Sequence, residues 1–168
     1  MAGRAMHADA PITGKALTLA ILLLAVLCGM SLWFLTAAVL PDIAAEAGLS
    51  TARLSLLSSA VQAGFVAGAV GIAVTGLADR LDPRAVFAGC AVLAAAANAA
   101  LLVVPLDGAL AVALRFLGGA FMAGVYPVGM KIAVGWGLRD RGLLVGALVG
   151  ALTFGKSLPY GLAWAGGS

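Results

Sequence analysis

Charged side chains are scarce in this chain. Only 10% of its 168 residues are Asp, Glu, Lys or Arg, whereas 63% are hydrophobic. An ordinary soluble domain has about 25% charged and about 45–50% apolar residues, and a disordered segment has few apolar residues. The composition therefore excludes both classes. Because the net charge of +3 is not gathered on a basic face, we expect no nucleic-acid partner.

Groups that perform catalysis or bind metals are also few. The single histidine, His7, lies near the amino terminus, and no pair of carboxylates lies within the long apolar runs. Cys28 and Cys90 lie inside apolar runs and have no second Cys or His at metal-ligand spacing. We therefore expect no enzyme, no metal site and no cofactor. We also expect both cysteines to be buried as small apolar residues.

Long apolar runs make up most of the chain. A membrane-spanning helix needs about 20 mainly apolar residues, whereas barrel strands alternate in hydrophobicity over about 10 residues. Backbone polar groups inside lipid must be satisfied internally, which favours helices. The sequence thus predicts an all-α, polytopic transmembrane bundle, whose five spans lie at about 16–40, 54–78, 85–106, 109–138 and 142–165.

The cations outside these spans are distributed unevenly. With a cytoplasmic amino terminus, only Arg53 lies outside the cell, whereas six cations lie inside: Arg4, Lys15, Arg80, Arg84, Arg139 and Arg141. Cytoplasmic loops of membrane proteins carry an excess of Lys and Arg. We therefore expect a multi-pass protein of the inner cell membrane, surrounded by the lipid bilayer. Residues 1–15 form its cytoplasmic tail.

Three cations lie inside the predicted spans. A charge in hydrocarbon costs free energy, so it faces a partner or a water-filled cavity. Lys131 lies near the cytoplasmic end, where its side chain can reach the membrane surface. Arg115 and Lys156 lie deeper, so we expect them in a solute cavity, with a structural ion pair as the alternative. Helical spacing puts Tyr126 near the face of Arg115 and Thr153 near that of Lys156, where both can hydrogen-bond a solute.

Small residues recur at helical spacing in the second, fourth and fifth spans. Glycines four positions apart let helices approach closely in lipid. Sliding or bending in a transport cycle is the alternative role. We expect helix packing at Gly64, Gly68, Gly119, Gly142, Gly146 and Gly150. The third span has one strong polar group, Asn98, and we expect that helix to be scaffold.

The loop after the second span reads TGLADRLDPR over residues 75–84. It resembles the pattern G-x-x-x-D-R-x-G-R-R between the second and third helices of the major facilitator superfamily. Asp79, Arg80 and Arg84 match this pattern, whereas the two positions before Arg84 depart from it. In that family the loop is a gate latch, so the resemblance implies a gating role for the three matching residues.

A second resemblance lies in the fourth span. The segment RFLGG, which begins at Arg115, is similar to the R-x-x-Q-G element of the same family, whose Arg is tied to proton coupling or substrate binding. Members have twelve helices in two six-helix halves. The resemblance therefore implies an N-terminal fragment that covers helices 1–5. The missing C-terminal half or an oligomer is its expected partner.

The same resemblance implies secondary active transport of a small-molecule solute by alternating access, with H⁺ as a coupling ion. Cavity cations at Arg115 and Lys156 favour an anionic solute, such as an organic acid or a phosphate ester. Drug or metabolite export is the alternative among transporters. A non-transporting membrane subunit, or an inactive truncated fragment, is the alternative outside that class. Solute flux distinguishes the two classes.

Overall fold

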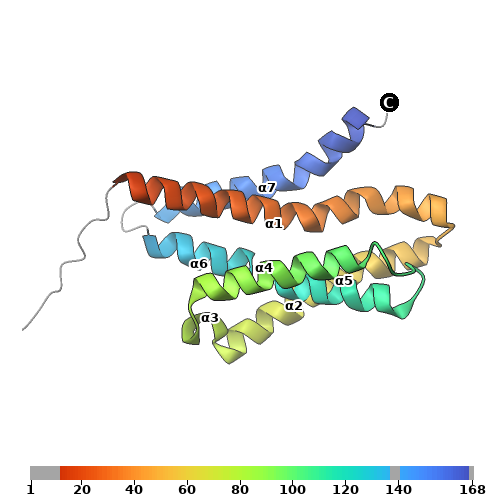
Figure 1. Cartoon of the computed structure of the whole chain (residues 1–168), viewed down its shortest axis with the longest axis horizontal. Coiled ribbons are helices and arrows are strands. Elements are labelled where there is room, and N and C mark those ends of the chain that lie inside the picture. The colour runs from red at the N-terminus through yellow and green to blue at the C-terminus, as the bar shows by residue number, and fades with distance from the viewer. Residues whose placement is uncertain (1–11, 137–140, 167–168) are drawn as a thin grey trace, which may run out of the picture.

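The computed structural model describes residues 12–136 and 141–166, which form helices joined by short turns (Figure 1). The helices are α1 (Ile12–Ala47), α2 (Thr51–Thr75), α3 (Leu77–Arg80), α4 (Pro83–Ala100), α5 (Ala109–Met122), α6 (Tyr126–Trp136) and α7 (Arg141–Gly166). No strand occurs among these residues. The predicted all-α fold is therefore confirmed.

Three helical stretches are long and apolar enough to cross a membrane, namely 51–75, 83–100 and 109–135. The helices α1 and α7 contribute shorter apolar stretches, Leu17–Met30 and Gly142–Phe154. Many large apolar side chains elsewhere are exposed, as expected of a surface that faces lipid. The chain is thus a multi-pass membrane helical bundle, and the five predicted spans fit it approximately.

The predicted fourth span is divided into α5 and α6 by a turn at residues 123–125. Pro127 has no N–H, so it cannot donate to the carbonyl four residues earlier in the helix. The main chain tightens there instead, because Gly124 donates to Phe121 at 2.9 Å and Val125 donates to Met122 at 3.0 Å. The helix is therefore broken over three residues just before this proline.

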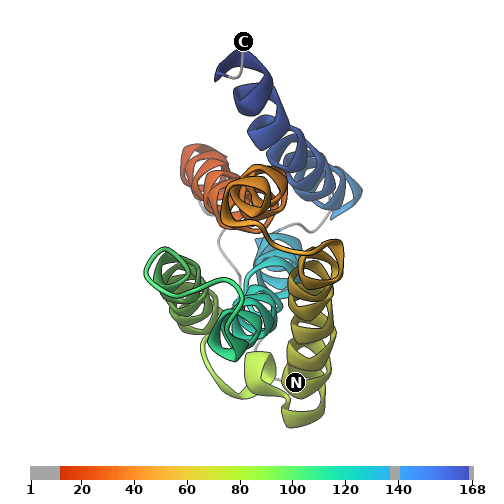
Figure 2. The same ribbon diagram turned by 90° about the vertical axis from the view of Figure 1, so that its right-hand side faces the viewer.

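The helices pack in two groups. The most extensive contacts join α2 to α5 and α1 to α7, while α4 lies against α5 and α6. Figure 2 shows α1 and α7 on one side of the bundle, with α2, α4 and α5 on the other. Apolar side chains fill the space between the groups. The buried members of this core are Leu22, Val26, Met30, Ala94, Met122, Val125, Ala133 and Leu148.

Glycines bring the main chains of α2 and α5 into contact. A methyl group added to Gly64 would collide with the main chain of Phe116, and one added to Gly119 would collide with that of Val61. Gly68 lies equally close to α5. Such close approach is how small residues stabilise helix pairs in lipid.

The glycines of α7 have different surroundings. Gly142, Gly146 and Gly150 are exposed, and a methyl group added to any of them would meet no described atom within 4 Å. These three residues therefore pack against no helix of the described chain. Helix packing at these three glycines stays a prediction, and it would require a partner outside the described residues.

The cysteines are less buried than predicted. Cys28 is exposed and Cys90 is half-buried, so the prediction of two buried cysteines is wrong. The core side of α1 is formed by Val26 and Met30. Residues two positions from these lie on the far side of the helix, and Cys28 therefore faces outward.

Candidate functional site

The loop from α2 to α4 is built from local capping interactions. The helix α2 ends at Thr75 and is capped by Gly76, which has φ 61°, a left-handed conformation that glycine adopts easily. After the short helix α3, α4 begins after Asp82, whose Oδ1 accepts a hydrogen bond from the main-chain N–H of Arg84 at 3.0 Å. Pro83 occupies the first turn, where its missing N–H leaves no hydrogen bond unmade. These two residues, which depart from the family pattern, thus form the start of α4.

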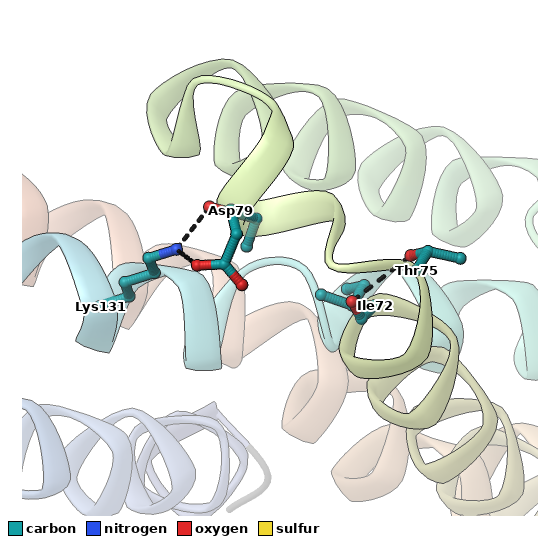
Figure 3. Close-up of polar contacts among 5 residues, drawn as sticks. Ile72, Thr75, Asp79 and Lys131 are labelled. Atoms are coloured by element: carbon teal, nitrogen blue, oxygen red, sulfur yellow. Dashed lines mark hydrogen bonds and ion pairs between the residues drawn. The ribbon is translucent and has the colours of Figure 1, made fainter.

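Asp79 is held by a cation from a distant part of the chain. Lys131 on α6 forms an ion pair with the Asp79 carboxylate, and its Nζ also donates to the main-chain oxygen of Ala78 at 2.6 Å (Figure 3). Both side chains are solvent-accessible in the isolated chain, at 42% for Lys131 and 78% for Asp79. Lys131 therefore reaches the end of the bundle, as predicted, and there it has a specific acceptor.

The other two predicted gating residues lie on the outside of this loop. Arg80 ends α3 and is exposed, and Arg84 lies in the first turn of α4 and is also exposed. The structure therefore pairs Asp79 with Lys131 on α6, whereas Arg80 and Arg84 are exposed residues of the same loop region.

Arg115 is the buried cation of the bundle. Its side chain is 4% exposed, which makes it the one buried charged side chain among the described residues. Its Nε donates to the main-chain oxygen of Leu57 on α2 at 3.3 Å. Its Nη2 is buried and has no described hydrogen-bond partner. An unpaired buried donor is destabilising, and it can donate a hydrogen bond to a ligand or a water molecule.

A small cavity adjoins Arg115. Its volume is about 20 Å³, and its walls include Trp33 from α1, Asn98 from α4, and Gly118 and Met122 from α5. A single buried water needs roughly 10–15 Å³, so the cavity has room for water but not for an organic solute. In this arrangement the neighbouring helices bury Arg115 and leave only this small space beside it.

The structure describes the side chains of three of the four predicted cavity residues, namely Arg115, Tyr126 and Thr153. Tyr126 is half-buried at the start of α6 and packs on the apolar core. Thr153 is exposed on α7, and its Oγ1 donates to the carbonyl oxygen of Val149 at 2.9 Å. Lys156 lies in α7, and its side chain is outside the described residues. Of the three whose side chains are described, Arg115 alone borders the small cavity.

Sequence reasoning missed other residues that surround Arg115. Asn98 was assigned to a scaffold helix, yet it lines the same cavity. Asn98 is the only strong polar group in that apolar span, and such groups face partners rather than lipid. This signal in the sequence could have placed Asn98 beside the cavity. The carbonyl of Leu57 carries no signal in the sequence, since every residue has one.

A comparison with protein-family models identifies a family for this chain. The model of the Major Facilitator Superfamily matches residues 21–163. This range contains α2 to α6 and most of α1 and α7, and it includes both the Asp79 loop and the Arg115 cavity. No curated protein and no solved structure matches the chain.

Proposed function

This chain belongs to the major facilitator superfamily, and from that premise we propose that it forms part of a secondary transporter that moves a small anionic solute by alternating access. Members of the family are generally secondary transporters, and the apolar helices are those of a multi-pass membrane protein. The choice of an anion depends on one observation. The buried guanidinium of Arg115 has an Nη2 with no described partner.

Electrostatics favours an anion at this position. Arginine stays charged in proteins, and its planar guanidinium matches a carboxylate or a phosphate. The acceptor that the structure gives Arg115, the carbonyl of Leu57, is neutral. A unit negative charge about 4 Å away is attracted by about 4 kcal/mol at an effective dielectric of 20, compared with about 1 kcal/mol in water. A neutral or cationic solute lacks this attraction.

The small volume of the cavity supports a mechanism that includes helix movement. Its volume of about 20 Å³ leaves no room for an organic acid beside Arg115. Solute binding therefore requires that α1, which carries Trp33, or α4, which carries Asn98, move relative to α5. In alternating access the site lies near the membrane midplane between two halves, and the halves rock around it. The second half expected for the family supplies the other wall.

The remaining predicted residues complete this proposal. Lys156 on α7 supplies a second cation to the solute site, and Tyr126 and Thr153 supply hydrogen-bond donors. Protons are the proposed coupling ion. Asp79, with Arg80 and Arg84, closes the cytoplasmic side against the second half.

The excess of cations on one side supports the orientation of the chain. We place the amino terminus and the tail of residues 1–15 in the cytoplasm. The bundle of residues 16–168 lies in the inner membrane.

Uptake by the full-length gene product tests the function. The protein is reconstituted into liposomes, and the entry of radiolabelled organic acids and phosphate esters is measured with and without a proton gradient. We expect gradient-driven uptake of at least one anion, and we expect Arg115→Gln and Lys156→Gln each to reduce it to background. Arg4→Gln, in the predicted tail, is the matched control and leaves uptake unchanged.

Two outcomes overturn the proposal. Unchanged anion uptake in Arg115→Gln removes Arg115 from the solute site. Uptake confined to neutral or cationic compounds replaces the anion with the solutes of a drug or metabolite exporter.

A further inference from the structure

A groove runs along the surface between α2 and α5, away from the Arg115 cavity. Its volume is about 820 Å³. Four of its lining residues are alanines, Ala60 and Ala63 on α2 and Ala109 and Ala113 on α5. Their small side chains leave a trough where larger residues would fill the space between two closely packed helices. The rest of the lining is apolar except for Arg53 and Ser59.

Arg53 lies at one end of the groove, in the first turn of α2. Its Nε donates to the carbonyl of Leu106 at 2.8 Å, and its Nη2 donates to the carbonyl of Gly108. These bonds fix the guanidinium beside the start of α5. Asp107, which is exposed in the same turn, makes no ion pair with Arg53. The positive charge therefore has only neutral partners within the described chain.

The same hydrogen bonds show that α2 and α5 begin at the same end of the bundle. The positive ends of both helix dipoles therefore meet near Arg53, and they add to its attraction for an anion. Because α2 is 25 residues long, or about 37 Å at about 1.5 Å per residue, its first turn lies at the edge of a hydrocarbon layer about 30 Å thick. Arg53 is thus a cation held at the membrane–water boundary.

The groove extends along the helices over about the thickness of one lipid leaflet. From Arg53 to Ala63 the helix rises about 15 Å, which is half of the hydrocarbon thickness of about 30 Å. A phospholipid in that leaflet has its phosphate at the boundary and its acyl chains over the same depth. The order of groups along the groove, a cation followed by mainly apolar side chains, matches the order of groups in such a lipid.

We infer that this groove binds an anionic phospholipid, with one acyl chain along the alanines and the phosphate on Arg53. The lipid covers the α2–α5 contact and joins the turn before α5 to the leaflet that surrounds it. This site depends on the chain being a membrane protein and does not depend on the proposed transport of a solute. Both can therefore be tested separately.

Lipid retention by the purified protein tests the site. The chain is titrated in detergent with phosphatidylglycerol or phosphatidylcholine, and bound lipid is counted by native mass spectrometry. We expect one phosphatidylglycerol to bind more tightly than the rest, and more tightly than phosphatidylcholine. Arg53→Gln weakens it about fivefold, the contribution of one cation near an anionic membrane surface. Ala63→Leu weakens it about tenfold, because it displaces about two methylenes of the chain.

The matched control is Ala96→Leu, the same change at an exposed alanine of α4 outside the groove, and it leaves the tight binding unchanged. Ala63→Leu keeps Arg53 and its two carbonyl acceptors, so it tests the groove even where Arg53→Gln unfolds the turn. Equal effects of Ala63→Leu and Ala96→Leu overturn the inference. Equal binding of the two lipids overturns it as well, as does a groove occupied by a second protein segment in the full-length gene product.

Discussion

Lys131 on α6 forms an ion pair with Asp79, which lies 52 positions earlier in the chain. The pair joins the second part of the broken fourth span to the loop between α2 and α4. It is exposed, so its expected contribution to stability is about 0.2–1 kcal/mol. Its larger consequence is positional, because it determines which way the Asp79 carboxylate points.

A double-mutant cycle measures this coupling. Asp79→Asn, Lys131→Gln and the double variant are unfolded reversibly in mixed micelles, and the three free energies of unfolding are compared with that of the parent. We expect a coupling energy of about 0.2–1 kcal/mol that declines with added salt. Strict additivity of the two single changes would show that the pair does not form.

Substitutions by alanine distinguish glycines that lie against another helix from glycines that lie on an open surface. Gly64→Ala and Gly119→Ala place a methyl group against a main chain, and such overpacking destabilises by about 1–3 kcal/mol. Gly146→Ala is the matched control, because it meets open space. We expect it to be neutral, or stabilising by up to about 1 kcal/mol through helix propensity. Thermal unfolding in detergent measures all three, and equal losses would contradict the α2–α5 contact described above.

We predict that Arg115 lowers the stability of the folded chain and is required for solute transport. Removal of a buried charge in favour of an apolar side chain of similar size is often neutral or stabilising, by about 1–4 kcal/mol. We therefore expect Arg115→Met to unfold at the same temperature as the parent protein or at a higher one. A fall of several degrees in the Tm of Arg115→Met would instead make Arg115 a structural residue.

The orientation of the chain is tested by thiol labelling in spheroplasts. With Cys28 and Cys90 replaced by Ala, single cysteines are introduced by Asp107→Cys and Arg84→Cys. The predicted topology puts position 107 outside and position 84 inside. A membrane-impermeant maleimide should therefore label the first at once and the second only after permeabilisation. The reverse pattern would invert the topology.

Much of the fold follows from composition alone. Runs of apolar residues this long can be satisfied only as helices in lipid, and the predicted ranges fit the described helices approximately. The exact ends depend on local chemistry. The helix α4 ends at Ala100 instead of continuing to 106, because the apolar residues that follow form a turn. Hydrophobicity cannot locate such a boundary, since residues on both sides of it are apolar.

The candidate site was harder to predict because its contacts join distant residues. The depth of Arg115 in its span indicated a buried cation, but its acceptor is a carbonyl on another helix. The position of Lys131 along its helix predicts that its side chain reaches the membrane surface. Its pairing with Asp79 cannot be predicted in this way, because it depends on how two spans lie relative to each other. The glycine spacing of α7 resembles that of α2, yet Gly64 and Gly68 of α2 contact α5, whereas Gly142, Gly146 and Gly150 of α7 contact no described atom of another helix. Spacing shows that close approach is permitted, and tertiary packing decides where it occurs.

The most direct test of the account is solute flux. The full-length gene product is reconstituted into sealed liposomes without ATP, a proton gradient is imposed, and the accumulation of a labelled organic anion is followed in the parent protein and in Arg115→Gln. The account predicts accumulation that collapses with a protonophore and is absent in Arg115→Gln. Accumulation that needs no gradient, or that persists in Arg115→Gln, would contradict it.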